Sequence, residues 1–425
     1  MDEKTIELFE GINLHIIKTD RFKTDFVAAF LFTDLTREDV TKNALIPAVL
    51  RRGTSELPTM KEISISLENN YGSVFDASSD KIGDKQALQF YITAINNKYT
   101  FSNEDILSQN INELCDIILN PKLENGVFDN KYVEQEKETL RELIKSKINN
   151  KASYANSRCI EEMCKGEPYG LDKFGYEEDL EKISSNELYD HYKDVLRTSE
   201  IHIYVSGDVD EERIREVIKD RFEHLERNYD ATRLQEDIRI NNAAAKVVTD
   251  NQDVTQGKLV LGYRVNEHEI LDDMYKLILY SAILGGTPSS KLFQNVREKE
   301  SLAYTIRSSY LKHKGIVLIS AGIEIENYEK ALQLIGKEVE DMRLGNFTEE
   351  EVDDAKIALE NAYLSYLDEQ TAIINLYMGQ RLLGNIQSIE EMIKSIKSIT
   401  KEDIINIANK LDLKMTYFLT GKENT

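Results

Sequence analysis

Histidine is the side chain on which metal and acid–base chemistry most often depends, and this sequence of 425 residues contains six. No two of them lie within five residues of each other. A helix that binds zinc instead presents two imidazoles at positions i and i+4, so that both point from one face. His202 lies in an apolar stretch and is expected in the core or at a strand edge, whereas the other histidines lie among charged residues and are expected at the surface. The spacing of the histidines therefore predicts no metal site.

Other patterns that carry chemistry are also missing. Cys159 and Cys164 lie five residues apart, on different faces of an expected helix and without a third ligand nearby, so buried packing is predicted for both. The segment Gly285–Lys291 resembles a phosphate-binding loop in composition, but it follows a helix and not a strand. No Gly-x-Ser-x-Gly nucleophile elbow occurs. Composition and spacing alone give the chain no catalytic constellation of its own.

One segment carries two side chains that are suited to binding an anion. A short capped helix is expected before Arg297, with an apolar stripe facing the core. A strand is expected over residues 302–306, which would place Tyr304 and Ile306 on one face. Arg297 and Tyr304 are then expected to converge above the corner between helix and strand. A simpler interpretation, a surface arginine and a half-buried tyrosine, stays open.

The elements that position these residues occur twice along the chain. A strand, a helix and the pair Gly53-Thr54 are followed later by a strand, a helix and the pair Gly286-Thr287, at an offset of 233 residues. Four later landmarks keep the same order, at offsets of 229, 224, 219 and 214. Because chance similarity would scatter these offsets, their steady fall indicates an internal repeat with small deletions in the second copy.

Each copy is expected to consist of two strands, two helices, two strands, long helices and a final strand. Strands and helices do not alternate strictly, so the fold class expected is α+β, with a mostly antiparallel sheet packed against helices in each half. A polar segment without clear periodicity separates the halves. The predicted organisation is an N-terminal domain over 1–226, a linker over 227–244 and a C-terminal domain over 245–425.

Composition restricts the class of partner. The chain has 53 basic and 76 acidic residues, a net charge of −23, so nucleic acid and anionic membranes are not expected as partners. It has no apolar run long enough for a transmembrane helix, and its acidic start does not resemble a secretory signal. Three cysteines, an odd number, fit a reducing compartment, and a cytoplasmic location is predicted. A peptide or protein partner remains open.

The segment from Gly285 to Tyr304 resembles the second-half signature of the insulinase-type (M16) zinc peptidases, roughly Gly-Gly-x-x-Ser-x-Leu-Phe-x-x-x-Arg-Glu-x-x-Gly-Leu-Ala-Tyr. Ser301 replaces the usual glycine of that signature. The resemblance extends over the whole chain and implies two α+β halves that face each other as a clamshell around a chamber. It also implies that Arg297 and Tyr304 project into the chamber, hold the substrate carbonyl and stabilise the oxyanion near the zinc.

The first half resembles the same family but lacks its zinc chemistry. The family helix reads His-x-x-Glu-His-x-x-x-x-Gly-Thr, and the register set by Gly53-Thr54 places Ala44 and Ala48 at the histidine positions. Pro47 stands at the position of the glutamate that activates water, where a proline within the helix costs about 3 kcal/mol unless the helix kinks or begins there. Alanine cannot bind zinc, and the arginines at 51 and 52 disfavour a nearby cation.

Two further positions follow from the same register. The distal metal ligand of the family would fall near Glu142 or Leu143, and a lone glutamate there cannot hold zinc. The substrate-binding strand of the family carries Gly-Gly-x-x-Asn-Ala, which corresponds here to residues 72–77 and ends in Asp76 and Ala77. Asp76 thus replaces the asparagine, whose side-chain amide contacts the substrate backbone in the family.

The resemblance implies a non-catalytic subunit of a heterodimeric zinc peptidase. Such a chain is inactive alone and holds no cofactor, while a partner subunit with the His-x-x-Glu-His motif carries the zinc. Arg297 and Tyr304 would complete the active site of the partner for peptide cleavage. Two alternatives stay open: a peptide-binding or structural protein without a catalytic role, and a self-sufficient hydrolase with unrecognised residues.

Overall fold

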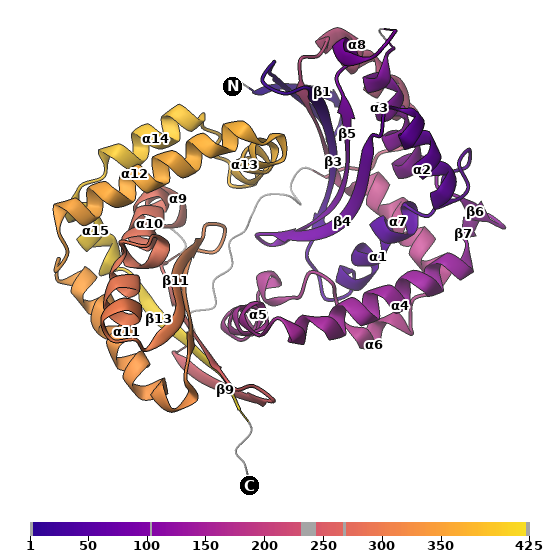
Figure 1. Ribbon diagram of the computed structural model, residues 1–425. Helices are drawn as coiled ribbons and strands as arrows, with labels where there is room; N and C mark the ends of the chain where they lie inside the picture. Colours follow the sequence, from indigo (N-terminus) through magenta and orange to yellow (C-terminus); the bar gives the residue numbers. More distant parts are fainter. Residues whose placement is uncertain (1–2, 103, 231–243, 267–268, 422–425) are drawn as a thin grey trace. The chain divides into compact units, whose positions relative to one another are not determined.

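The protein is described here from a computed structural model, which covers residues 3–102, 104–230, 244–266 and 269–421 (Figure 1). The chain divides into two compact units. The first consists of Met1–Lys145, Leu171–Glu236 and Gln370–Met378, and the second of Ser146–Gly170, Asp237–Glu369 and Gly379–Thr425. Of the predicted linker 227–244, residues 231–243 lie outside the described residues, so the linker and the domain bounds set by it stay a prediction.

The first unit is built on a six-stranded sheet with the strand order β1-β2-β8-β3-β5-β4. Only β2 and β8 run parallel; the other neighbouring strands are antiparallel, as the sequence predicted. The strands are β1 (Glu3–Phe9), β2 (Ile12–Lys18), β3 (Thr24–Asp34), β4 (Val74–Ile82), β5 (Lys85–Ile95) and β8 (Glu200–Gly207). A two-stranded ribbon of β6 (Leu123–Glu124) and β7 (Val127–Phe128) lies apart from this sheet.

Helices cover one face of this sheet and enclose the core of the unit (Figure 1). Because side chains alternate along a strand, Val27, Ala29 and Leu31 of β3 all point into that core. The helices are α1 (Val40–Leu50), α2 (Met60–Asn69), α3 (Ile106–Leu119), α4 (Asn130–Ser146), α6 (Glu177–Leu180), α7 (Ser185–Thr198) and α8 (Glu211–Phe222), with the 3₁₀ turn η1 (Asn97–Tyr99). A late segment joins the unit at the start of α13 (Gln370–Leu382), where Gln370 Nε2 donates to the carbonyls of Thr24 and Ser206 at 3.1 and 2.8 Å.

The second unit repeats this topology. Its five-stranded sheet has the order β9-β13-β10-β12-β11, which matches β2-β8-β3-β5-β4 strand for strand, and its one parallel pair, β9 with β13, matches β2 with β8. The strands are β9 (Lys246–Gln252), β10 (Gly257–Arg264), β11 (Ala303–Leu311), β12 (Ile316–Ile323) and β13 (Asp412–Gly421). The predicted pair of similar α+β halves is confirmed, and β1 is an addition to the first sheet.

Helices of the second half cover one face of the second sheet. They are α9 (Glu269–Asp272), α10 (Met274–Ser281), α11 (Tyr328–Arg343), α12 (Glu349–Ser365), α14 (Ile389–Ser398) and α15 (Lys401–Ala408), with the π-helical turns η5 (Ala282–Gly286) and η6 (Phe293–Lys299) and the 3₁₀ turns η7 (Ile325–Asn327) and η8 (Tyr366–Asp368). Gly285 breaks the helical path with φ −161° and ψ 18°. A Cβ there would stand 2.6 Å from the backbone nitrogen of Ser308, so only glycine allows η5 to approach β11 this closely.

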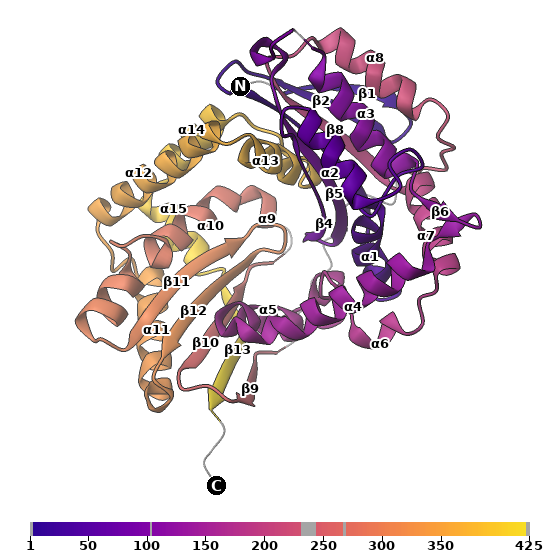
Figure 2. The ribbon, with the colours of Figure 1, turned by 45° about the vertical axis from the view of Figure 1, so that its right-hand side comes forward.

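The other face of the second sheet is covered by α5 (Lys151–Met163), which comes from the first half of the sequence and lies across β10 and β13 (Figure 2). Cys159 and Cys164 are buried there, as predicted, among apolar residues of the sheet. Between α5 and the 3₁₀ turn η3 (Pro168–Gly170), Glu167 forms a buried ion cluster: it accepts two hydrogen bonds from Arg264 at 2.6 and 2.7 Å and lies 3.2 Å from Lys314. Residues 146–170, which include the 3₁₀ turn η2 (Lys147–Asn149), thereby belong to the second unit.

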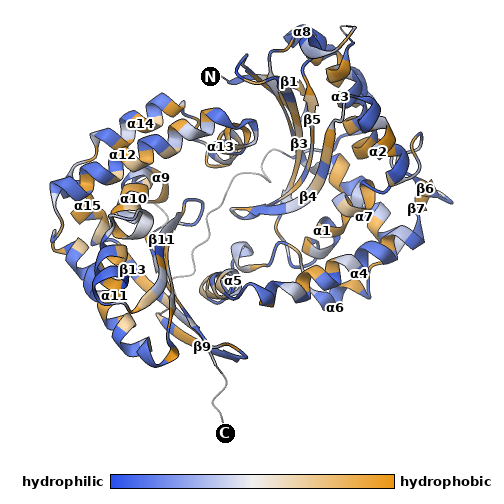
Figure 3. Cartoon of the chain, in the orientation of Figure 1, coloured by the Kyte–Doolittle hydropathy of each residue, from blue (hydrophilic) through white to orange (hydrophobic). Residues whose placement is uncertain are grey.

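Hydrophobic residues are concentrated along the strands of both sheets, whereas α4 is largely hydrophilic (Figure 3). Among the described residues, no helix combines the length and the apolar character needed to cross a membrane.

Candidate functional site

The helix α1 occupies the position at which the first half would hold a metal. Ala44 is packed in the core and 9% exposed, and Pro47 is also buried. The helix runs through Pro47 to Leu50, and the Pro47 carbonyl still accepts a hydrogen bond from the backbone of Arg51 at 3.2 Å. Ala48 is half-buried on the same helix. These three positions therefore carry methyl and ring carbons packed against neighbours, and no group that could coordinate a metal.

The surroundings of α1 are occupied by structural hydrogen bonds. Asn43, which is fully buried, donates through Nδ2 to Thr33 Oγ1 and Gln86 Oε1, both at 3.0 Å. The Oδ1 atom of Asn43 lies 2.8 Å from His191 Nε2. Burial lowers the pKa of His191, so the neutral imidazole is favoured beside α1. This polar network packs α1 onto the sheet, and its side chains hydrogen-bond to one another.

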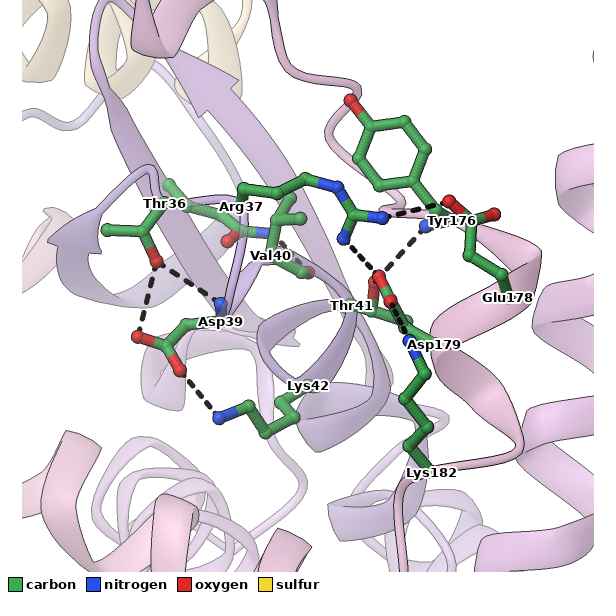
Figure 4. A network of polar contacts seen from close by, with 11 residues as sticks. Thr36, Arg37, Asp39, Val40, Thr41, Lys42, Tyr176, Glu178, Asp179 and Lys182 are labelled. Carbon is green, nitrogen blue, oxygen red and sulfur yellow. Dashed lines mark hydrogen bonds and ion pairs between the residues drawn. The ribbon is translucent and has the colours of Figure 1, made fainter.

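The start of α1 is held by a second network (Figure 4). Thr41 Oγ1 donates to Asp179 Oδ2 at 3.1 Å and accepts from the backbone of Tyr176 at the same distance. The guanidinium of Arg37 lies 3.9 Å from the centroid of the Tyr176 ring and pairs with Glu178 at 2.9 Å. These contacts join α1 to α6, and they hold the N-terminal end of α1 in place through ion pairs, hydrogen bonds and the stacking of Arg37 on Tyr176.

Asp76 and Ala77 lie on β4, at the edge of the first sheet. Asp76 Oδ1 lies 3.5 Å from Arg51 Nη1 and accepts from the backbone of Ala77 at 2.8 Å. The hydroxyl of Tyr91 donates to Asp76 Oδ2 at 3.1 Å, and burial together with the Asp76 charge raises the pKa of Tyr91. The Asp76 carboxylate is thus engaged within the unit, and the predicted substrate contact stays a prediction.

Glu142 and Leu143, the predicted neighbours of the distal ligand position, are both exposed on α4. The acidic residue of α4 that faces the end of α1 is Glu136, which is 7% exposed and pairs with Arg52. A cation therefore already neutralises this carboxylate. Within the described residues, no three His, Cys, Asp or Glu side chains are grouped closely enough to hold a metal ion.

At the helix–strand corner of the second unit, unlike at α1, the polar side chains are exposed. Arg297 belongs to η6, and its side chain is 41% exposed, 4.5 Å from the ring centroid of Phe293 and 3.8 Å from Glu298. Ser301, in the turn that follows, has φ 52°, a left-handed conformation that explains why the family has glycine there. This turn leads directly into β11 and brings Tyr304 to the start of the strand.

Tyr304 and Ile306 do not share a face, which corrects the prediction. The register with β12 shifts between Ala303 and Thr305, so that a bulge at Tyr304 interrupts the alternation of side chains. Tyr304 is consequently 56% exposed, whereas Ile306 is 7% exposed. The Tyr304 hydroxyl donates to Glu324, and this hydrogen bond raises the pKa of Tyr304. In the described structure no hydrogen bond joins Arg297 to Tyr304, and both side chains remain accessible.

One expectation about histidine is wrong. His202 is buried in β8, as predicted, but His15 is also fully buried, on the neighbouring strand β2. The two rings are linked by a contact of 2.8 Å between His15 Nε2 and His202 Nδ1, and Glu200 lies 3.0 Å from the far side of His202. His15 is buried because β2 pairs with β8 on one side and with β1 on the other, where Thr5 Oγ1 lies 3.0 Å from His15 Nδ1.

The fold and the site together define a metallopeptidase-like chain whose helix α1 offers no metal ligand at Ala44, Pro47 or Ala48. Residues 182–359 match the family profile described as "Peptidase M16 inactive domain". A "Probable inactive metalloprotease YmfF" of Bacillus subtilis is 34% identical over 97% of this chain and 96% of its own length. The chain therefore belongs to the M16 peptidase family.

Three further proteins are similar to this chain over most of its length. An "Uncharacterized zinc protease YmxG" of Bacillus subtilis is 24% identical over 84% of this chain and 87% of its own length. The crystal structure of a conserved protein from Enterococcus faecalis superposes with a TM-score of 0.89 and 28% identity over the full length of both chains. A protease from Helicobacter pylori shares the fold, with a TM-score of 0.79 and 17% identity over 99% of both chains.

The zinc that the family implies does not fit α1, since Ala44, Pro47 and Ala48 offer no ligand.

Proposed function

We propose that this chain is the zinc-less subunit of a heterodimeric M16 peptidase and that it supplies Arg297 and Tyr304 to the active site of a zinc-bearing partner. The observation that carries the proposal is the contrast between α1, whose ligand positions are packed with carbon, and the corner at Arg297 and Tyr304, whose polar side chains are exposed. The name of the Bacillus subtilis relative, a probable inactive metalloprotease, supports the absence of activity in the chain alone.

The two side chains have the chemistry that such a role needs. Cleavage of a peptide bond builds negative charge on the carbonyl oxygen, and donors aimed at that oxygen stabilise the transition state more than the ground state. The Tyr304 hydroxyl is protonated at neutral pH, as a tyrosine normally is, and the hydrogen bond to Glu324 raises its pKa further, so that it can act as a hydrogen-bond donor. The guanidinium of Arg297 offers several hydrogen-bond donors, and among the described residues its acidic neighbour is the adjacent Glu298, at 3.8 Å. Neither residue supports a core.

The experiment pairs the chain with an M16 subunit that carries His-x-x-Glu-His and measures complex formation and peptide turnover separately. Tyr304→Phe and Arg297→Ala should form the complex normally and lower kcat about 10²- to 10³-fold, the usual effect of removing one oxyanion donor. Tyr99→Phe and Arg215→Ala are matched controls, since both side chains are exposed in the first unit. Wild-type turnover by a double variant at Arg297 and Tyr304 would overturn the proposal.

A second candidate, a peptide-binding or structural protein without a catalytic role, is favoured by two contacts. The Asp76 carboxylate is engaged by Arg51 and Tyr91, and the Tyr304 hydroxyl is engaged by Glu324. The same experiment separates the candidates, because this role needs no turnover. A cytoplasmic location is part of the proposal, since the three cysteines are buried and none forms a disulfide.

A further inference from the structure

The sheet face covered by α5 in the second unit changes character along its strands. Under the helix, Val260, Leu318 and Tyr417 form part of an apolar cluster. Toward the start of β10 the face becomes polar and holds a pocket of about 340 Å³, bounded by the first turns of α5 and by β10, β12 and β11. A cavity of this volume accommodates a group the size of an amino-acid side chain or a chain terminus.

Strand register places two cations in this pocket. Gly322 of β12 lies between Lys258 of β10 and Thr305 of β11. Two residues earlier on β12, Ser320 pairs with Arg307 of β11. Residues two apart on a strand share a face, so Lys258, Thr305 and Arg307 all line the same pocket. The ammonium and the guanidinium thus approach one space from opposite sides of β12.

Gly322 keeps that space open. A Cβ added to Gly322 would stand 3.0 Å from Thr305 Oγ1 and 3.2 Å from both Lys258 Nζ and Gln256 Oε1. The volume above Gly322 is therefore flanked by two donors, the hydroxyl and the ammonium group, and by the Gln256 amide oxygen, which accepts a hydrogen bond from Lys258. The opposite wall is fixed by a hydrogen bond of 2.6 Å from Ser320 Oγ to Asn156 of α5. An acceptor atom placed above Gly322 would meet donors that are already in position.

The charges of the lining are not balanced. Neither aspartate nor glutamate lines the pocket. Lys258 donates to the neutral amide of Gln256, and burial lowers the pKa of Lys258, as expected for a cation without a carboxylate beside it. Arg307 is exposed, and its side chain forms no hydrogen bond or ion pair within the described part of the chain. In a chain with a net charge of −23, two such cations in one pocket form a local site of attraction for an anion.

We propose that this pocket binds a carboxylate group of a peptide, either its C-terminus or an acidic side chain. Arg307 offers the planar fork that matches a carboxylate, and Lys258 and Thr305 complete its hydrogen bonds. A neighbouring hollow of about 830 Å³ shares Asn150, Ala152 and Lys258 with the pocket and gives room for the adjoining residues of the peptide. The choice of a peptide over other carboxylates rests on the function proposed above.

The test measures binding of labelled peptides to the full chain without any zinc subunit, so its result does not depend on turnover. A panel of short peptides is compared in three forms: free C-terminus, amidated C-terminus, and acidic residues changed to their amides. If the C-terminus is the ligand, amidation should weaken binding about tenfold; if an acidic side chain is the ligand, the amide substitutions should do so. Binding that is unchanged in both series overturns the proposal, as does the absence of binding by every peptide.

Variants of the pocket residues test whether the peptide binds in this pocket. Arg307→Gln should weaken binding about tenfold without affecting the fold, because its side chain is exposed. Gly322→Ala should block the pocket, and Lys258→Met should act as Arg307→Gln does. Lys394→Gln, on the exposed face of α14, is the control that makes the same change in net charge. Wild-type affinity in Arg307→Gln and Gly322→Ala, or displacement of the peptide by inorganic phosphate at lower concentration than by acetate, overturns the assignment.

Failure of this test leaves the catalytic proposal intact, since that proposal depends on Arg297 and Tyr304. Conversely, a chain that binds peptide carboxylates but does not support turnover would retain the pocket and lose the catalytic role.

Discussion

The helix α1 and the corner from η6 to β11 are the two places at which the repeated halves could carry chemistry, and they differ in how their side chains are used. Around α1, small apolar residues and a hydrogen-bonded network fill the space. At the corner, Arg297 and Tyr304 are 41% and 56% exposed. One topology thus supports a site closed by packing in the first half and an accessible one in the second.

The difference has a physical basis in the neighbours of each charge. Near α1, Arg51 and Arg52 are paired with Asp76 and Glu136, so the acidic groups of that region are already bound to cations. At the corner, the acidic neighbour of Arg297 within the described part of the chain is the exposed Glu298 on its own helical turn. A group whose charge is satisfied internally stabilises the fold, whereas one left to solvent is available to a ligand.

The largest expected effect tests whether α1 is closed. Ala44→His should lower the free energy of unfolding by about 2–4 kcal/mol, because a larger polar ring would replace a methyl group in a packed core. Denaturant unfolding with and without zinc measures this. Ala48→His, at the half-buried position, is the matched control and should cost less than about 1 kcal/mol. Recovery of stability on adding zinc to either variant would show that the region can still form a metal site.

A smaller effect on the free energy of unfolding should appear when the pH is changed. Burial lowers the pKa of His191 below its ordinary value of 6.5, so the unfolded chain binds more protons than the folded one just below that pH. This contribution to stability is therefore present above about pH 6.5 and is lost as the pH falls through the lowered pKa. His191→Gln, which keeps a donor for Asn43, should remove it. Unfolding of both proteins at about pH 7.5 and 5.5 gives the comparison, and equal pH dependence would contradict it.

At the corner, Ser301→Gly should raise the free energy of unfolding by about 0.5–1 kcal/mol. Ser301 has φ 52°, and glycine adopts this conformation without the clash of a Cβ, although it gains entropy in the unfolded chain. Thermal unfolding measures the change. A decrease in stability would mean that the serine side chain makes a contact that outweighs the backbone strain.

The smallest effect is expected for Asp76→Asn, which restores the family residue on β4. The Asp76–Arg51 pair is 3.5 Å long and its side chains are 46% and 37% exposed, so the change in unfolding free energy should stay below about 0.5 kcal/mol. Denaturant unfolding again tests this. A loss above about 2 kcal/mol would indicate that Asp76 is structural and not a remnant of a substrate-binding edge.

Much of the fold follows from the sequence because it depends on local periodicity. The steady offsets predicted two similar halves, and the two sheets have matching strand orders. A strand over residues 24–32 and a helix over 40–50 were predicted, and they occur as β3 (Thr24–Asp34) and α1 (Val40–Leu50). The lack of a zinc ligand at Ala44, Pro47 and Ala48 also needed only residue types, since no tertiary contact gives an alanine a lone pair.

Other features depend on contacts between distant residues, which periodicity does not encode. The bulge that turns Tyr304 outward arises from its register with β12. The burial of His15 depends on His202, 187 residues away, and the membership of residues 146–170 in the second unit depends on Glu167 meeting Arg264. The carboxylate pocket likewise requires β10, β11 and β12 to align Lys258 with Arg307. The sequence alone determined which elements form and which chemistry is lost; only the tertiary structure decided which side chains meet, because pairing between strands sets their partners.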